Sequence, residues 1–173
     1  MTALEGHYLT LACFDGQNSL PHIYAEMRLE VHNTKSVLLN ILKSKHTDYL
    51  KFIDAIITLT KFCRSIGDFD TILLDQAIEF LNNNNDETTL LSIKCLQTWG
   101  ELYYYANDMK SAKNKLLEAE KLCLLSSIDS NHLYGSILTI LGQICLSQHK
   151  LNEAADLYQR ALHLHKTTND ILG

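Results

Sequence analysis

The sequence predicts an all-α fold in which antiparallel helix pairs stack into a solenoid of about seven or eight helices. Apolar residues recur at helical spacing along most of the chain. The 173 residues include one proline and seven glycines, too few for a strand-and-turn architecture of this length. Three short turns also follow one another at a nearly constant spacing, which is typical of helical repeats.

The first part of the chain, residues 1–46, is expected to form N-terminal helices that serve as a degenerate repeat or a cap. A short helix is predicted over residues 2–14. A longer one runs from about His22 to Ser44 and begins beside Pro21, a favourable residue for a helix start. Asn33 and Thr34 could divide this pattern into two helices.

Residues 47–173 are expected to hold repeated helix pairs, a weak one at about 48–85 and two clear ones at 88–126 and 131–166. The predicted helices span about 49–65, 72–81 and 90–106, then a partner helix that follows the turn at 107–109 and runs to about Leu125, and the two parts of 131–166. Residues 168–173 look like the start of a further repeat. We therefore expect either a longer array or a C-terminal end that a partner covers, since solenoids need a polar terminal face.

The repeat is visible in both turns and glycines. The predicted turns begin at Gly67, Asn107 and His149, so the spacings are 40 and 42 residues. Gly100 and Gly142 are also 42 residues apart, each in the first helix of its pair. A glycine at that place leaves room for the second helix to approach the backbone closely.

Other residues complete this packing pattern. Alanines are expected where helices approach one another, and larger side chains are expected to fill the space between them. The alanines are Ala112, Ala119, Ala154 and Ala161, and the large residues are Trp99, Tyr103, Leu141 and Tyr158.

These residues resemble the tetratricopeptide repeat, whose signature is W-x2-L-G-x2-Y followed by A-x3-F and a further alanine. The resemblance covers about residues 48–166, and the long period is similar to the extended repeats of the kinesin light chain and of LGN/Pins adaptors. It departs from the family at Thr60, which replaces the glycine, and at Leu124 and Lys166, which replace the final proline. The resemblance implies a right-handed α-solenoid that acts as a non-catalytic scaffold or adaptor for protein–protein interaction.

In such a solenoid the first helix of each pair lines a concave groove, which would bind a peptide or helix of a partner protein. The residues predicted to line it come from three successive first helices: Lys61, Arg64, Lys94, Gln97, Glu101, Tyr104, Tyr105, Thr139, Gln143 and Leu146. Tyr103, Tyr104 and Tyr105 cannot all lie in the core, because a helix buries one side. At least one is expected to face the groove.

Composition excludes several classes of partner. The net charge is −5 with a pI near 5.9, so we expect no nucleic acid and no anionic membrane surface as a partner. Apolar runs are too short for a membrane span, and the N-terminus has no secretory signal pattern. Five cysteines at wide spacing, without C-x-x-C, indicate a reducing setting, hence an intracellular and cytoplasmic protein, with the nucleus not excluded.

No pattern of catalytic, cofactor-binding or metal-binding residues is present, so the chain is not expected to be an enzyme. His163 and His165 point about 200° apart on a helix and cannot hold one metal ion. Asp68, Asp70 and Asp108 fit turn or cap positions. Glu101 beside Lys94 disfavours the two-carboxylate clamp with which some tetratricopeptide repeats bind chaperone tails.

Two alternatives remain open at this stage. The chain could be a structural subunit that assembles through its ends, including self-association or larger assembly through the uncapped C-terminal end. It could also be the peptide-sensing arm of a longer regulatory protein, whose output would lie on other sequence.

Overall fold

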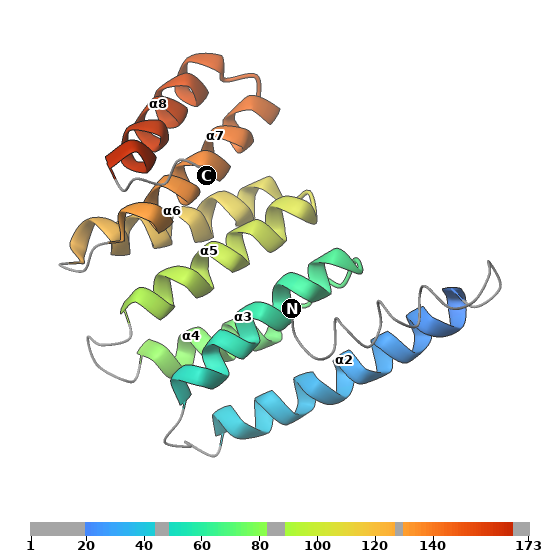
Figure 1. Cartoon of the computed structure of the whole chain (residues 1–173). Helices are drawn as coiled ribbons and strands as arrows, with labels where there is room; N and C mark the ends of the chain where they lie inside the picture. Colours follow the sequence, from blue (N-terminus) through green and yellow to red (C-terminus); the bar gives the residue numbers. More distant parts are fainter. Residues whose placement is uncertain (1–19, 44–48, 83–88, 127–129, 168–173) are drawn as a thin grey trace.

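The computed structural model describes residues 20–43, 49–82, 89–126 and 130–167. Within these ranges the secondary structure consists of seven α-helices and no strand, so the predicted all-α class is confirmed. The helices follow one another in space as in sequence, from α2 to α8 (Figure 1). None of the described helices is both long and apolar enough to cross a membrane. The helix predicted at 2–14 and the repeat start at 168–173 lie outside the described residues.

Helix α2 (Leu20–Lys43) is continuous, so the possible division at Asn33 and Thr34 does not occur. The Thr34 hydroxyl donates a hydrogen bond to the Glu30 carbonyl, 2.8 Å away, and this keeps its polar group within the helix. Three apolar side chains of α2 are buried against the other helices: Val31, Leu38 and Leu42.

The other six helices form three hairpins. These are α3 (Tyr49–Ser65) with α4 (Ile72–Asn82), α5 (Thr89–Tyr105) with α6 (Met109–Leu125), and α7 (Asn131–Ser147) with α8 (Leu151–Thr167). All of these helices except α4 have the same length, 17 residues. The first helices start at Tyr49, Thr89 and Asn131, and the second helices α6 and α8 start at Met109 and Leu151. The helices therefore repeat at the spacing that the turns predict.

The three turns share one backbone conformation. Gly67, Asn107 and His149 have φ values of 76°, 63° and 59°. In each turn the N–H of the following residue donates to a carbonyl five residues back, at 2.9 Å: Asp68 to Cys63, Asp108 to Tyr103, and Lys150 to Cys145. This is the Schellman arrangement that ends a helix with a left-handed residue. The turn is thus a repeated structural unit, although only the first has glycine at its left-handed position.

The two equivalent glycines allow close contact within their hairpins, as predicted. A Cβ on Gly100 would lie 2.6 Å from Cγ of Leu116, and one on Gly142 would lie 2.9 Å from the Tyr158 ring. Both distances are below normal van der Waals contact, so a larger residue would push the helices apart. Leu116 and Tyr158 also stand at equivalent positions of the repeat.

The first hairpin departs from this pattern. Thr60 stands at the glycine position, is buried, and bonds to the Ile56 carbonyl within α3. Helix α4 begins seven residues after α3 ends, against four between α5 and α6. Ile72, which is equivalent to the buried Ala112, is 56% exposed. Helix α4 instead buries a neighbouring face made of Leu73, Leu74, Ala77 and Leu81. Compared with α6, α4 is therefore rotated about its own axis.

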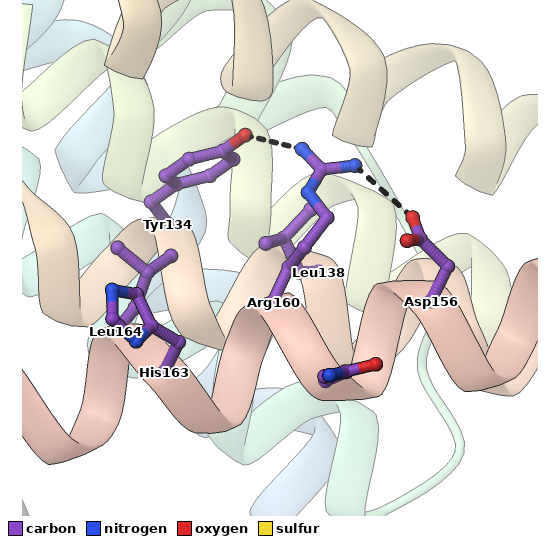
Figure 2. Close-up of a pocket in the computed structure, with 7 residues that line it drawn as sticks. Tyr134, Leu138, Asp156, Arg160, His163 and Leu164 are labelled. Atoms are coloured by element: carbon purple, nitrogen blue, oxygen red, sulfur yellow. Dashed lines mark hydrogen bonds and ion pairs between the residues drawn. The ribbon is translucent and has the colours of Figure 1, made fainter.

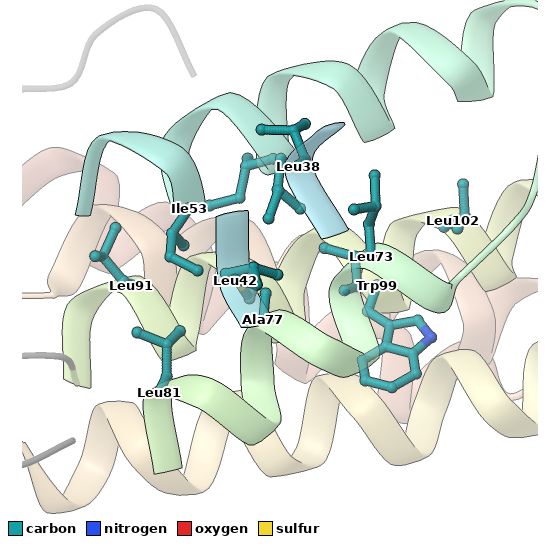
Figure 3. Close-up of a cluster of buried hydrophobic side chains, with 13 residues drawn as sticks. Leu38, Leu42, Ile53, Leu73, Ala77, Leu81, Leu91, Trp99 and Leu102 are labelled. Carbon is teal, nitrogen blue, oxygen red and sulfur yellow. The ribbon is translucent and has the colours of Figure 1, made fainter. Parts of the chain in front are cut away.

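Two clusters of buried side chains form the core, and α5 contributes to both. The first joins α2, α3, α4 and one side of α5, with Leu38, Ile53, Ala77 and Trp99 among its members (Figure 3). The second joins the other side of α5, through Ile93 and Leu96, to α6, α7 and α8. Helix α5 is therefore buried on both sides between neighbouring hairpins, an arrangement compatible with an α-solenoid.

A charged contact ties α2 to the first hairpin. Lys35 Nζ lies 2.7 Å from an Asp68 carboxylate oxygen and 3.1 Å from one of Asp70. Both carboxylates also accept backbone N–H bonds in the turn, from Asp70 and Ile72. Burial opposes the charge on Lys35, but the two hydrogen-bonded carboxylates outweigh it and raise its pKa. The carboxylates are thus turn residues, as predicted, with a further partner in α2.

Candidate partner-binding surface

The first helices of the hairpins lie side by side. Helix α3 packs against α5, and α5 packs against α7, whereas among the described residues the backbones of α4 and α6, and those of α6 and α8, do not approach one another as extensively. The three first helices α3, α5 and α7 therefore form one continuous side of the described array.

The ten predicted groove residues come from these three helices, and we call them the α3–α5–α7 surface. Many stand at equivalent positions of the repeat, such as Lys61, Glu101 and Gln143. The same spacing relates Arg64 to Tyr104 and Leu146. The surface thus consists of stripes that cross the helices, one residue from each hairpin.

Its centre is a hydrogen-bonded network between α3 and α5. Arg64 Nη1 lies 2.7 Å from Oε2 of Glu101, with the two side chains 27% and 17% exposed. Gln97 Nε2 donates to the other carboxylate oxygen of Glu101 at 3.0 Å. Three of the predicted residues are therefore brought together; the two charges offset each other, and the amide helps to fix the carboxylate.

The same arginine also contacts the tyrosines at the end of α5. The Arg64 guanidinium lies 4.5 Å from the centroid of the Tyr105 ring, within cation–π distance. Tyr104 meets Tyr105 edge-on, with centroids 5.4 Å apart. Tyr103 turns the other way and stacks on Trp99 at 6.3 Å.

Of the three tyrosines, Tyr105 is the exposed one, at 59%, while Tyr103 and Tyr104 are half-buried against the second core cluster. This agrees with the expectation that not all three lie in the core. It also narrows the aromatic part of the surface to Tyr105 and the outer edge of Tyr104.

Lys94 stands three residues before Gln97 on α5 but has a different partner. Its ammonium is 3.8 Å from Asp54 of α3, and the side chains of Lys94 and Asp54 are 39% and 61% exposed. Lys94 thus forms a second, looser link between α3 and α5, and its charge is offset by Asp54. It does not join the Arg64 network.

The remaining predicted residues differ in what they offer. Lys61, Gln143 and Leu146 are exposed, Leu146 at 44%. Thr139 is half-buried, and its hydroxyl donates to the Gly135 carbonyl at 2.9 Å, so it bonds within its own helix. The α7 part of the surface therefore presents mainly one amide and one aliphatic side chain.

A separate concavity, of about 530 Å³, lies between α7 and α8 (Figure 2). At its wall the Arg160 guanidinium donates to the Tyr134 hydroxyl at 2.6 Å and to Glu120 of α6 at 3.2 Å. Asp156 lies 3.8 Å from the same guanidinium. Burial of Tyr134 raises the pKa of its phenol, although Arg160 opposes that rise.

The sequence did not predict this contact. Two carboxylates balance Arg160, so the arrangement links α6, α7 and α8 more readily than it attracts an anion. One feature of the sequence does indicate this contact. Glu120 and Arg160 have opposite charges and lie about one repeat apart, hence on successive second helices.

The described residues contain no group of histidine, cysteine or acidic side chains that could hold a metal ion. His163 is exposed at the concavity, whereas the His165 ring packs over Gly135, where a Cβ would lie 2.8 Å away. Cys63, Cys95, Cys123 and Cys145 are buried free thiols. Burial raises the pKa of Cys63 to about 11 and that of Cys95 to about 12, so neither is a reactive thiolate at neutral pH.

No protein-family model matches the chain, and a search of curated proteins finds no match. The resemblance to tetratricopeptide repeats therefore rests on the sequence pattern, and any function proposed for the chain rests on the geometry of the surface.

Proposed function

We propose that the chain is a non-catalytic interaction scaffold that binds a peptide or helix of a partner protein along the α3–α5–α7 surface. The observation that supports this most is an exposed tyrosine beside a fixed polar network on α3 and α5, together with an exposed leucine on the neighbouring first helix α7. Tyr105 and Leu146 can bury apolar surface, while Arg64 and Glu101 are already oriented by each other. Recognition surfaces commonly combine aromatic anchors with polar groups of this kind.

The charges suggest which partner segments fit. Glu101 offsets Arg64, and Asp54 offsets Lys94, so the surface has no concentrated positive charge for an acidic tail. Tyr105 and Leu146 favour an apolar or aromatic anchor residue in the partner. Gln143 and Lys61 lie at the polar edge and would bond to the backbone or to polar side chains of the segment.

The buried thiols fit a reducing setting, and we include a cytoplasmic location in the proposal. A partner segment that is bound through side-chain contacts needs no cofactor, and the proposal involves none.

The experiment is a selection of displayed peptides on the immobilised protein, followed by affinity measurement of the selected peptides. The test variant is Tyr105→Ala with Leu146→Ser, because both side chains are exposed and neither belongs to a core cluster. The matched control is Leu124→Ser on α6, which is 65% exposed and lies outside the surface.

We expect selected peptides to bind the wild type and the control equally and to lose at least tenfold in affinity for the test variant. Glu101→Lys is a poorer test, because it would also break the contact with Arg64. If the peptides bind the test variant as tightly as the wild type, the surface is not the binding site and the proposal fails.

A further inference from the structure

The exposed apolar side chains of the α3–α5–α7 surface lie at one end of its helices. Tyr105 is the last residue of α5, and Leu146 is the next-to-last residue of α7. The turns that follow α3, α5 and α7 all lie at the same end of the stack (Figure 1). Away from this end the surface is polar, with Gln97 and Glu101 on α5 and Gln143 on α7. The apolar part of the surface therefore runs across neighbouring helices and not along one of them.

The polar groups at the centre of this surface are already hydrogen-bonded to one another. The two carboxylate oxygens of Glu101 accept from Arg64 at 2.7 Å and from Gln97 at 3.0 Å. The Thr139 hydroxyl donates to a carbonyl of its own helix at 2.9 Å. Because the surface is made of helices, its backbone N–H and C=O groups are also bonded internally. Few hydrogen-bonding groups are left at the centre for a bound partner.

This distribution favours a helical partner segment over an extended one. An extended peptide has unbonded backbone N–H and C=O groups, and those that turn toward a protein surface lose their water on binding. At the centre of the α3–α5–α7 surface they would meet few free donors or acceptors. A helix bonds its own backbone groups, so it can bury apolar side chains against Tyr105 and Leu146 without leaving those groups unbonded.

We propose that the partner segment is an amphipathic helix that crosses α5 and α7 near the turns that follow them. This inference rests on the proposed function and narrows the partner from a peptide or helix to a helix. Packed neighbouring helices lie about 8–10 Å apart, and seven residues of a helix span about 10.5 Å on one face. The partner helix therefore carries two apolar residues seven positions apart, one against Tyr105 and one against Leu146.

The charges of the surface add an acidic residue to this pattern. Lys61 of α3 is exposed and, among the residues that the structure describes, forms no ion pair. Arg64 beside it is offset by Glu101, and α7 presents the neutral Gln143. The uncompensated positive charge thus lies on the α3 side. The end of the partner helix that reaches α3 therefore carries an aspartate or glutamate that pairs with Lys61.

The first test is the conformation of a bound peptide. The probes are peptides of about 20 residues, about 30 Å long as helices, selected on the wild type and weakened by Tyr105→Ala with Leu146→Ser. We expect the carbon chemical shifts of the isotope-labelled, bound peptide to be helical between its two apolar anchors. Extended values in such a peptide would overturn the helix assignment and leave the proposed function standing. If no selected peptide depends on Tyr105 and Leu146, the proposed function fails, and the helix assignment fails with it.

The second test places proline at two positions of the same peptide. A proline between the two apolar anchors should lower the affinity by about a hundredfold, because proline breaks the interior of a helix. The matched control is a proline at the first helical position, which helices accept, and it should leave the affinity within about twofold of the parent peptide. Equal affinities of the two proline peptides would contradict a helical partner.

The third test is a charge reversal at Lys61. Lys61→Glu should weaken binding of the acidic peptides by about tenfold, and a peptide with lysine in place of its acidic residue should bind this variant more tightly than the wild type. Lys110→Glu, which changes an exposed lysine of α6 outside the surface, is the matched control and should leave both affinities unchanged. Circular dichroism checks that both variants keep their helices. A Lys61→Glu variant that binds the acidic peptides like the wild type, or that gains nothing from the reversed peptide, contradicts the pairing with Lys61.

Discussion

Gly142 lies directly beneath the ring of Tyr158, so close that a Cβ on the glycine would be 2.9 Å from the ring. The same relationship joins Gly100 to Leu116 one repeat earlier. These contacts set the distance between the two helices of each hairpin, and they make glycine necessary for a packing reason rather than for its backbone freedom.

Gly142→Ala should therefore lower the free energy of unfolding by about 1–3 kcal/mol, the usual cost of overpacking a close contact. Urea unfolding followed by circular dichroism measures it. In a Tyr158→Ala background, Gly142→Ala should cost less free energy of unfolding than in the wild type, because the ring that the new methyl group meets is gone. Equal destabilisation by Gly142→Ala in the presence and absence of the ring would show that the contact is not the cause.

The Arg64–Glu101 ion pair joins neighbouring hairpins, and its side chains are only partly exposed. Arg64→Met or Glu101→Gln should lower stability by about 0.2–1 kcal/mol, the range for pairs at or near the surface. The reversed pair, Arg64→Glu with Glu101→Arg, should be more stable than either reversal alone. A double-mutant cycle from thermal unfolding measures the coupling, and a coupling of zero would mean that the pair does not hold the helices together.

The docking of α2 should depend on pH through Lys35 and Asp70. Burial opposes ionisation of Asp70, but the Ile72 N–H and Lys35 outweigh it and lower its pKa. The stabilisation that Asp70 gives to α2 docking is thus present above the ordinary carboxyl pKa, and it is lost as the pH falls through the lowered pKa of Asp70. Lys35, whose pKa is raised, contributes below its ordinary value and loses that contribution as the pH rises through the raised one.

Hydrogen exchange of α2 amides over a pH series checks this dependence. In the wild type, exchange should accelerate at both the acidic and the strongly basic end, relative to intrinsic rates. Lys35→Met should show faster exchange at neutral pH and little further change toward either end. An identical pH profile for the variant would contradict the assignment.

The left-handed residue His149 offers a way to stabilise the protein. A non-glycine residue at positive φ is strained, by roughly 1–2 kcal/mol in the left-handed region. His149→Gly should raise the free energy of unfolding by up to about 1 kcal/mol, since the added freedom of the unfolded chain offsets part of the gain. Gln148→Gly is the matched control, because its φ of −92° suits any residue, and it should lower stability. Urea unfolding measures both variants, and a loss of stability in His149→Gly would show that the turn is not strained.

Much of the fold follows from short-range patterns. Gly100, Gly142 and the turn residues occur at a nearly constant spacing, and helices that repeat at this spacing must pack in a repeated way. The same reasoning fails for α4, because the longer turn after α3 changes which face it buries. Nothing in its own sequence distinguishes Ile72 from the buried Leu73.

The sequence indicates which residues lie on the first helices, but it does not indicate which of their side chains contact one another. Arg64, Lys94 and Glu101 read as available charges in the sequence, yet each has a partner on the neighbouring first helix. Such pairs depend on the offset between adjacent helices, which a single helix pattern does not contain. The Tyr134–Arg160–Glu120 contact was missed for the same reason, since it joins three helices.

The most direct test of the proposed function is hydrogen exchange of the protein with and without a selected peptide. Binding along the α3–α5–α7 surface predicts that the peptide protects amides of α5 and α7, and the nearer end of α3, while exchange in α4, α6 and α8 stays the same. Protection confined to α6 or α8, with none in α5 and α7, would contradict it.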